Sequence, residues 1–447
     1  MRTEGKAIDT LDEAMVSGSG QLVGEGGGSL FVNSASWTGA RAVTGFVRVG
    51  VFLAIARAYG PGSLGQVSLA LSTVEILRTF SEFGIDTVSI RKFAQTAPDK
   101  RGELLQTVVG SKLALAACFY CVGLGVLAVI ADKKTEILLG AIASLSLFLV
   151  GAFGAFSSYL QSRFSMSRVL SATLWGSAAS VVFSSFAIWA RWPLALVIAA
   201  LPLADGLNVA FIWRRLGVRV RARFSLSDTV RLLRESLPVG LMAVLIVMYL
   251  RLDSFFVYKF SGEAALGLYA ACFRMVEPAL MVPHSFAMTA YSVLSSPTRG
   301  DDSPGEVAEI LFRTMWPAYA FISIASLLLV LYGRLALGLF GSSYAAALPA
   351  LQILAAVLIV RTANITLTSI LYSHGRYSTL ARITASNLAV NIVLVMLFVP
   401  NFGIRGAACA VLLTEVWNLG AQLMAARGHL GNRCRGLSLE SQNANSV

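Results

Sequence analysis

Residues 37–96 read WTGARAVTGFVRVGVFLAIARAYGPGSLGQVSLALSTVEILRTFSEFGIDTVSIRKFAQT, and this stretch decides the fold. It predicts two apolar helices joined by a short Gly/Pro turn, each long enough to cross a bilayer. Arg41 and Arg48 are seven residues apart and share one helix face. Glu75, Arg78 and Glu82 follow the i, i+3, i+7 spacing and form a second polar stripe. Guanidinium groups inside lipid-spanning helices are the main indication of function.

The composition of the whole chain is that of a polytopic membrane protein. Of its 447 residues, 56% are hydrophobic and only 13% are charged, whereas soluble domains carry about 25% charged residues. The net charge of +12 would suit a nucleic-acid partner only if the cations were clustered on one surface. They lie mostly in alternate loops, which is a topology signal, so no nucleic-acid partner is expected.

Twelve apolar segments divide into two sets of six, and this predicts an all-α protein with two six-helix lobes. The segments lack the period-two alternation of barrel strands. We predict transmembrane helices near 31–56, 64–83, 105–130, 136–158, 168–190, 194–214, 236–258, 265–291, 310–332, 346–371, 378–399 and 406–426. The predicted units are a flexible tail 1–29, a lobe 30–214, a basic linker 215–235, a lobe 236–426 and a tail 427–447.

The distribution of basic residues orients these helices. The loops after the even-numbered helices and the C-terminal tail are the richer in Lys and Arg, and the linker 215–235 carries six arginines. By the positive-inside rule, that side is the cytoplasm. Both termini are then expected to be cytoplasmic. The linker could instead bind anionic lipid or nucleic acid, but its position between two spans favours the orientation signal.

A short internal repeat relates the two halves. SLGQVSLALSTVEILRTFSEFG, from residue 63, aligns with ALGLYAACFRMVEPALMVPHSF, from residue 265. The alignment pairs Gly65 with Gly267 and Glu75 with Glu277. Because six helices separate the copies, the halves have the same orientation, and a substrate site is expected between them near the midplane.

Charges inside the predicted spans are costly, at roughly 2.5–3.5 kcal/mol each on insertion scales, and must face protein or a water-filled cavity. Arg41, Arg48 and Arg361 have no carboxylate within one turn of their own helix, which favours binding of an anionic ligand. Arg78 and Arg274 do have one, so a structural ion pair is an equal alternative. Lys112 could extend its amine to the membrane surface. Candidates for ion coupling or for structural pairs are Glu75, Asp205, Asp253, Glu277 and Glu415.

Two segments resemble a known family. ARAYGPGSLGQVSLALSTVEILRTFSEFGIDTVSIRKFAQ, from residue 56, is similar to the start of Wzx-type flippases for O-antigen and exopolysaccharide units. These belong to the multidrug/oligosaccharidyl-lipid/polysaccharide (MOP) exporter superfamily, which also contains the MATE transporters. MYLRLDSFFVYKFSGEAALGLYAACFRMVEPALMVP, from residue 248, has the family's Arg-x-Asp and Gly-x-Tyr features, at Arg251, Asp253, Gly267 and Tyr269. Cys272 stands where the pattern usually has alanine.

The resemblance implies a two-lobed flippase that moves an undecaprenyl-diphosphate-linked oligosaccharide across the bacterial inner membrane by alternating access. Cationic residues are implied to handle the anionic substrate. Arg41, Arg48, Arg78 and Arg274 fall in the matching helices, and Arg361 is added from its own helix. The implied partners are the lipid-linked anionic oligosaccharide, membrane lipid, and the polymerase and chain-length proteins of the same pathway. No cofactor, metal site or enzymatic activity is expected.

Two other functions are compatible with the sequence. A cation-coupled drug exporter of the same superfamily would use carboxylates such as Asp205, Asp253 and Glu415, although the unpaired arginines oppose a cationic drug. A membrane polymerase of the same pathway would need an acidic motif. Asp301 and Asp302, in the turn RGDDSPGE, are the nearest candidates, but Gly, Ser and Pro around them favour a solvated turn.

Overall fold

The computed structural model describes residues 49–131, 133–163, 165–216, 221–295 and 304–444 of the chain. Within these ranges the protein is built from helices, and no residue is assigned to a strand. The chain is helical over 49–82. The elements that follow are α2 Ile85–Gln95, α3 Arg101–Ile130, α4 Lys134–Ser144, α5 Ser146–Gln161, α6 Met166–Trp189, α7 Leu194–Arg215, α8 Leu226–Val276, η1 Glu277–Leu280, α9 Met281–Leu294, α10 Pro304–Gly338, η2 Ser342–Ala347, α11 Leu348–Ser373 and α12 Tyr377–Ala444.

In the described part of the chain, eight helices are long and apolar enough to cross a membrane. The prediction of an all-helical, multi-pass membrane protein is therefore confirmed. Two of the eight are interrupted by a glycine with positive φ, Gly262 at 84° in α8 and Gly403 at 55° in α12. Glycine adopts this conformation without the steric cost that a Cβ would bring. Gly262 lies in the predicted loop between spans 236–258 and 265–291, and Gly403 lies in the one between 378–399 and 406–426. The count of twelve crossings stays a prediction.

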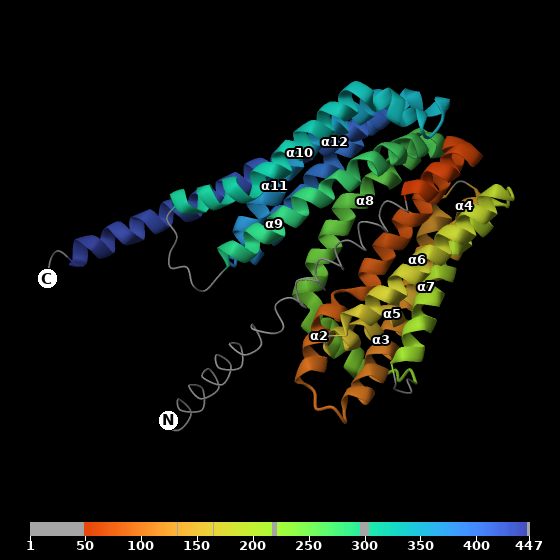
Figure 1. The fold of residues 1–447 in the computed structure, drawn as a ribbon, viewed down its shortest axis with the longest axis horizontal. Helices are drawn as coiled ribbons and strands as arrows, with labels where there is room; N and C mark the ends of the chain where they lie inside the picture. Colours follow the sequence, from red (N-terminus) through yellow and green to blue (C-terminus); the bar gives the residue numbers. More distant parts are fainter. Residues whose placement is uncertain (1–48, 132, 164, 217–220, 296–303, 445–447) are drawn as a thin grey trace.

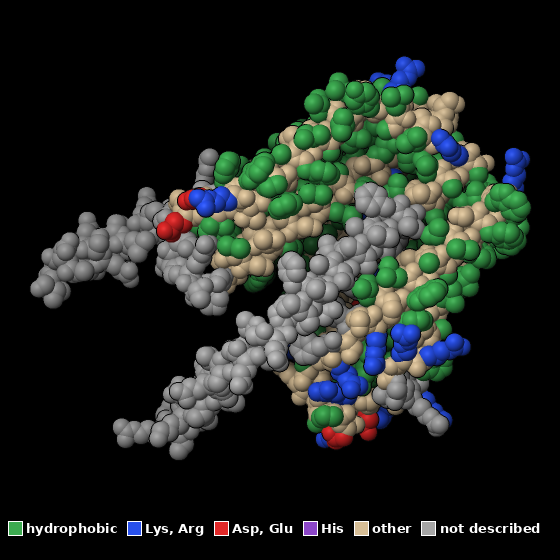
Figure 2. All heavy atoms as spheres, in the orientation of Figure 1, with side chains coloured by type: hydrophobic (Ala, Val, Ile, Leu, Met, Phe, Trp, Pro, Cys, Tyr) green, Lys and Arg blue, Asp and Glu red, His purple; other side chains and the backbone are tan. Residues whose placement is uncertain are grey.

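The helices form two bundles that meet at one end and diverge toward the other (Figure 1). The first bundle contains the segment 49–82 and α2–α7, and the second contains α9–α12. The helix α8 runs from the first bundle to the second. At the end where the bundles meet, Arg57 Nε donates to the carbonyl oxygen of Leu339 at 2.5 Å, and Lys133 pairs with Glu263 at 2.8 Å. Lys and Arg side chains gather at the opposite end of the first bundle (Figure 2).

The two bundles cross most closely at a pair of glycines. A Cβ added at Gly65 would overlap the carbonyl oxygen of Glu263, and one added at Gly267 would overlap that of Pro61. The predicted repeat relates residues by a shift of 202, which converts Pro61 and Gly65 into Glu263 and Gly267. The contact is therefore reciprocal, as expected on a two-fold axis.

A second feature supports the repeat. Gly60 and Gly262, which the same shift relates, have φ values of 80° and 84°. Each glycine precedes the close crossing by the same number of residues, so both copies turn in the same way before they meet. The structure thus places an approximate two-fold axis between the bundles, at Gly65 and Gly267.

The structure changes two predicted boundaries. α8 begins at Leu226, inside the predicted linker 215–235, and α12 continues to Ala444, beyond the predicted end of the last span. The beginning of α8 folds because the first bundle anchors it: Lys92 pairs with Glu235 at 2.9 Å, and the Thr229 hydroxyl donates to Ser111 Oγ at 2.8 Å. Most of the predicted first helix and the tail 1–29 lie outside the described residues.

Candidate functional site

A small charged cavity lies between the bundles, next to the two-fold axis. Its volume is about 30 Å³, roughly the share of a single water molecule in liquid water. The segment 49–82, α8 and η1 supply the walls. We call it the interbundle cavity; its polar lining residues are Ser68, Ser72, Glu75, Arg251, Asp253, Ser254, Tyr269, Arg274 and Glu277.

Arg251 holds two carboxylates in this cavity. Its Nε lies 2.7 Å from Glu75 Oε2, and one terminal nitrogen lies 2.9 Å from Glu277 Oε1. Glu75 and Glu277 are the pair that the repeat relates, and they come from opposite sides of the two-fold axis. Arg251 therefore ties the first bundle to the second at the level of the predicted substrate site.

Arg274 faces the same cavity and shares Glu277. Its terminal nitrogen lies 3.5 Å from Glu277 Oε2, which is a longer pairing than those of Arg251. The centre of its guanidinium lies 3.8 Å above the ring of Phe52. A guanidinium stacked in this way is held flat against the ring, and its planar fork has the geometry that matches a phosphate or a carboxylate.

Asp253 is buried at the wall of the cavity and is bound by neutral donors. The Tyr269 hydroxyl donates to Oδ2 at 2.5 Å, and the backbone N–H of Ser254 donates to Oδ1 at 2.7 Å. Both oxygens are therefore occupied, although Arg251 is only two residues away on α8. Charge-assisted bonds of this kind fix the side chains of both partners.

The charge of the cavity differs from the expected surplus of arginine. Among the described residues that line it, two guanidiniums face three carboxylates. Arg41 and Arg48, which were predicted to contribute from the first helix, lie outside the described residues. The described part of the cavity thus holds one more carboxylate than guanidinium groups.

Arg361 has a carboxylate partner that its own helix could not reveal. Its Nε lies 2.5 Å from Glu415 Oε1 on α12. Tyr249 and Asn364 donate to the same carboxylate at 2.6 Å each. Glu415 is only 1% exposed. Polar side chains of α11 and α12 therefore meet, and the argument that Arg361 lacks a carboxylate does not hold in the folded protein.

The other predicted residues lie outside the interbundle cavity. Arg78 pairs with Glu82 at 3.1 Å on its own helix, and Asp86 and Asp205 lie within electrostatic range of its guanidinium. Lys112 does not extend to the surface as expected: it is fully buried, and its Nζ lies 2.5 Å from Asp86 Oδ1.

Sequence reasoning missed several partners of these charges. Asp86 and Glu263 lie in predicted loops and Glu136 begins a predicted helix, and none of the three was among the candidate partners. The structure pairs Asp86 with Lys112, Glu136 with the Tyr258 hydroxyl, and Glu263 with Gln66 and Lys133. The one available signal was Lys112 itself, because a lysine within an apolar run requires a nearby acceptor.

The Arg251 contacts predict a conformational effect. We expect Arg251→Ala to shift the protein away from the present arrangement, in which the ends opposite Gly65 diverge. Spin labels on the exposed residues Ser167 and Ser378 should then report an added population at a shorter distance by electron double resonance. Glu75→Gln and Glu277→Gln should each have a smaller effect, because the other carboxylate keeps Arg251 bound.

The double variant Glu75→Gln, Glu277→Gln should match Arg251→Ala in the same measurement. Arg231→Ala is the control, since its side chain is 77% exposed and pairs only on its own helix with Glu235. A distance distribution unchanged in Arg251→Ala would contradict the role of this contact.

Comparison with known proteins identifies the family and the fold. The family described as "Polysaccharide biosynthesis protein" matches residues 54–333. No curated protein sequence matches the chain. Among solved structures, the lipid II flippase MurJ in an inward closed conformation has a TM-score of 0.73 at 13% identity, over 87% of this chain and 86% of that one. An inward-facing multidrug resistance MATE family transporter of the MOP superfamily has 0.69 at 15%, over 89% and 96%. A MOP superfamily transporter from Pyrococcus furiosus has 0.53 at 16%, over 92% and 94%.

Proposed function

This chain belongs to the polysaccharide biosynthesis protein family with a MOP-superfamily fold, and we propose that it is a flippase for a lipid-linked sugar. Its substrate would be an undecaprenyl-diphosphate-linked oligosaccharide, the repeat unit of an exopolysaccharide or O-antigen. It would cross a bacterial inner membrane by alternating access, without chemical change. The polymerase and chain-length proteins of the same pathway would be its partners after transport.

The observation that carries this proposal is Arg274 in the interbundle cavity. Its guanidinium is stacked on Phe52 and shares Glu277 with Arg251, and it lies beside the two-fold axis where the bundles must separate. An incoming diphosphate would compete with Glu277 for its guanidinium. Such a forked contact suits arginine better than lysine. The carboxylates of the cavity then have a role, since they hold the arginines in place until an anion arrives.

The topology supports uptake from the cytoplasmic side. The end at which the bundles diverge carries the loop after α2 and the beginning of α8 (Figure 1), which the positive-inside rule assigns to the cytoplasm. With Gly60, Gly262 and Gly403 as breaks between spans, the protein would cross the membrane twelve times. Both termini would lie in the cytoplasm, and this conformation would be the one that receives substrate.

Replacement of Arg274 tests the site. We expect Arg274→Ala to lower export of the polysaccharide by at least about tenfold, because a hydrogen bond to a charged group contributes about 1.5–3 kcal/mol. Arg274→Lys should keep part of the activity, since it keeps the charge but loses the fork. The measurement is surface polysaccharide in a deletion strain that carries each variant at matched protein levels.

Arg313→Ala is the matched control, because its ion pair with Glu309 is exposed. Deletion of the gene should cause complete lipid-linked units to accumulate on the cytoplasmic leaflet. Full export by Arg274→Ala would remove this arginine from the site. Complete units on the outer leaflet of the deletion strain would reject the flippase itself.

The excess of carboxylates in the described cavity favours one second candidate, a cation-coupled drug exporter of the same superfamily. Asp253 would be its coupling residue, since it is buried and bound by neutral donors. Drug sensitivity of a pump-deleted host separates the two functions. Protection that disappears in Asp253→Asn, with normal surface polysaccharide, would favour the exporter.

A further inference from the structure

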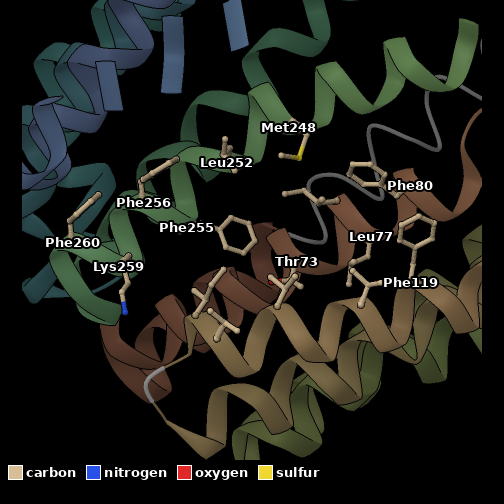
Figure 3. A pocket seen from close by; sticks show the side chains of 15 residues that line it. Thr73, Leu77, Phe80, Phe119, Met248, Leu252, Phe255, Phe256, Lys259 and Phe260 are labelled. Atoms are coloured by element: carbon tan, nitrogen blue, oxygen red, sulfur yellow. The ribbon is translucent and has the colours of Figure 1, made fainter. Parts of the chain in front are cut away.

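A large apolar pocket opens beside the interbundle cavity, on the outer side of the same two helices. Its volume is about 600 Å³, and it lies between the segment 49–82, α3 and α8. Phe255 of α8 faces Thr73 and Leu77 across the gap (Figure 3). Five phenylalanines contribute to its walls: Phe80, Phe119, Phe255, Phe256 and Phe260. We call it the lateral pocket.

Close backbone contacts bound the lateral pocket at both ends. At one end, Gly65 meets the backbone of Glu263. At the other, a Cβ on Gly240 would lie 2.5 Å from the carbonyl oxygen of Phe83, and one on Gly84 would lie 2.9 Å from the backbone nitrogen of Gly240. The two helices touch at these glycines and separate between them. The pocket is therefore a window in the side of the molecule, built by the backbone.

The lateral pocket and the interbundle cavity are lined by neighbouring residues of the same two helices. Along each helix, one residue faces the charges and the next faces the apolar space, so the two sites lie at the same depth in the membrane. The pairs, cavity residue first, are Ser72 and Thr73, Glu75 and Ile76, Arg251 and Leu252, and Ser254 and Phe255. The polar and the apolar sites are two sides of one helix–helix gap.

The geometry points to the lateral pocket as the binding site for the isoprenoid chain of the lipid-linked substrate, next to its diphosphate. This inference rests on the proposed function. A diphosphate at Arg274 lies near the midplane, so its chain must leave the cavity sideways at that depth. An ordinary phospholipid keeps its headgroup at the bilayer surface, so its phosphate does not reach the depth of Arg251 and Arg274. An amphiphile with a deep anionic head and a branched apolar tail fits both spaces together.

Photolabelling tests the location of the chain. The probe is undecaprenyl phosphate with a diazirine on one of the isoprene units nearest its phosphate, added to the full-length protein in vesicles of phosphatidylethanolamine and phosphatidylglycerol. We expect labelled peptides from 119–130 and 248–260. Unlabelled undecaprenyl phosphate should abolish the labelling, whereas the phosphatidylglycerol already present in excess should not.

Variants that fill the pocket sharpen the test. Val126→Trp on α3 and Leu252→Trp on α8 narrow it from two different walls, and each should lower labelling at least about fivefold. Val182→Trp on α6 is the control, because Val182 is 69% exposed and does not line the pocket. Labelling is compared only among variants whose melting temperature equals that of the parent protein. Because the two substitutions lie on different walls, one of them can still test the inference if the other fails to fold.

The possible results separate this inference from the proposed function. Labels outside the lateral pocket, or equal labelling by a diazirine-bearing phosphatidylglycerol, would overturn the isoprenoid site while leaving the flippase intact. Labelling as expected, with normal polysaccharide in the deletion strain, would keep the isoprenoid site and reject the flippase.

Discussion

Arg361→Ala is expected to lower the free energy of unfolding by about 3–5 kcal/mol, the usual cost of leaving one charge of a buried ion pair alone. Arg361 and Glu415 are 14% and 2% exposed in their side chains. Tyr249 and Asn364 complete the shell of Glu415, so removal of Arg361 leaves this buried carboxylate with neutral donors. The loss should appear as a large fall in melting temperature in detergent.

Two further variants show whether this pair is structural. Glu415→Gln should destabilise nearly as much, because Arg361 then lacks its anion. The double variant Arg361→Met, Glu415→Leu should recover much of the loss, since apolar replacements of a whole buried pair are often neutral. Arg313→Ala, in the exposed pair with Glu309, should change little.

The same double variant decides the predicted role of Arg361 in substrate binding. If the double variant is stable and exports polysaccharide, Arg361 supports the second bundle and does not hold substrate. If it is stable and inactive, the original prediction stands. A stable, active Arg361→Ala would contradict both roles.

Gly65→Ala is expected to destabilise the contact between the bundles by about 1–3 kcal/mol, the range for overpacking a close contact. The obstacle is the backbone of Glu263, which cannot move aside as a flexible side chain would. Gly267→Ala should act alike, because the contact with Pro61 is reciprocal. Melting temperature measures the effect on stability, and surface polysaccharide measures the effect on transport.

Gly125→Ala provides the matched control. Gly125 lies in α3, and a Cβ added there would have no neighbour within 4 Å. Alanine is the better helix former, so this variant should be as stable as the parent or slightly more stable. Equal melting temperatures for Gly65→Ala and Gly125→Ala would show that the crossing adapts, and the two-fold contact would lose its importance.

The sequence by itself determined the class of protein, its helical segments and its internal repeat. Membrane helices satisfy their own backbone hydrogen bonds, so apolar length reveals them without knowledge of the neighbours. The repeat could be recognised in the sequence because both copies have glycine at one position, Gly65 and Gly267, and glutamate ten residues later, Glu75 and Glu277. The beginning of α8 at Leu226 could not be predicted from apolar length, because its polar first turns fold against the first bundle rather than within lipid.

Only the tertiary structure decided which charges meet. Arg361 looked unpaired because its carboxylate lies 54 residues away on α12. Lys112 was expected to extend its amine to the membrane surface because Asp86 lies on another helix. The spacing of residues along one helix shows which of them share a face, but it does not show which residues of other helices that face contacts. The depth at which two helices cross is set by packing, and this crossing put Arg251 between Glu75 and Glu277 and left an apolar window beside them.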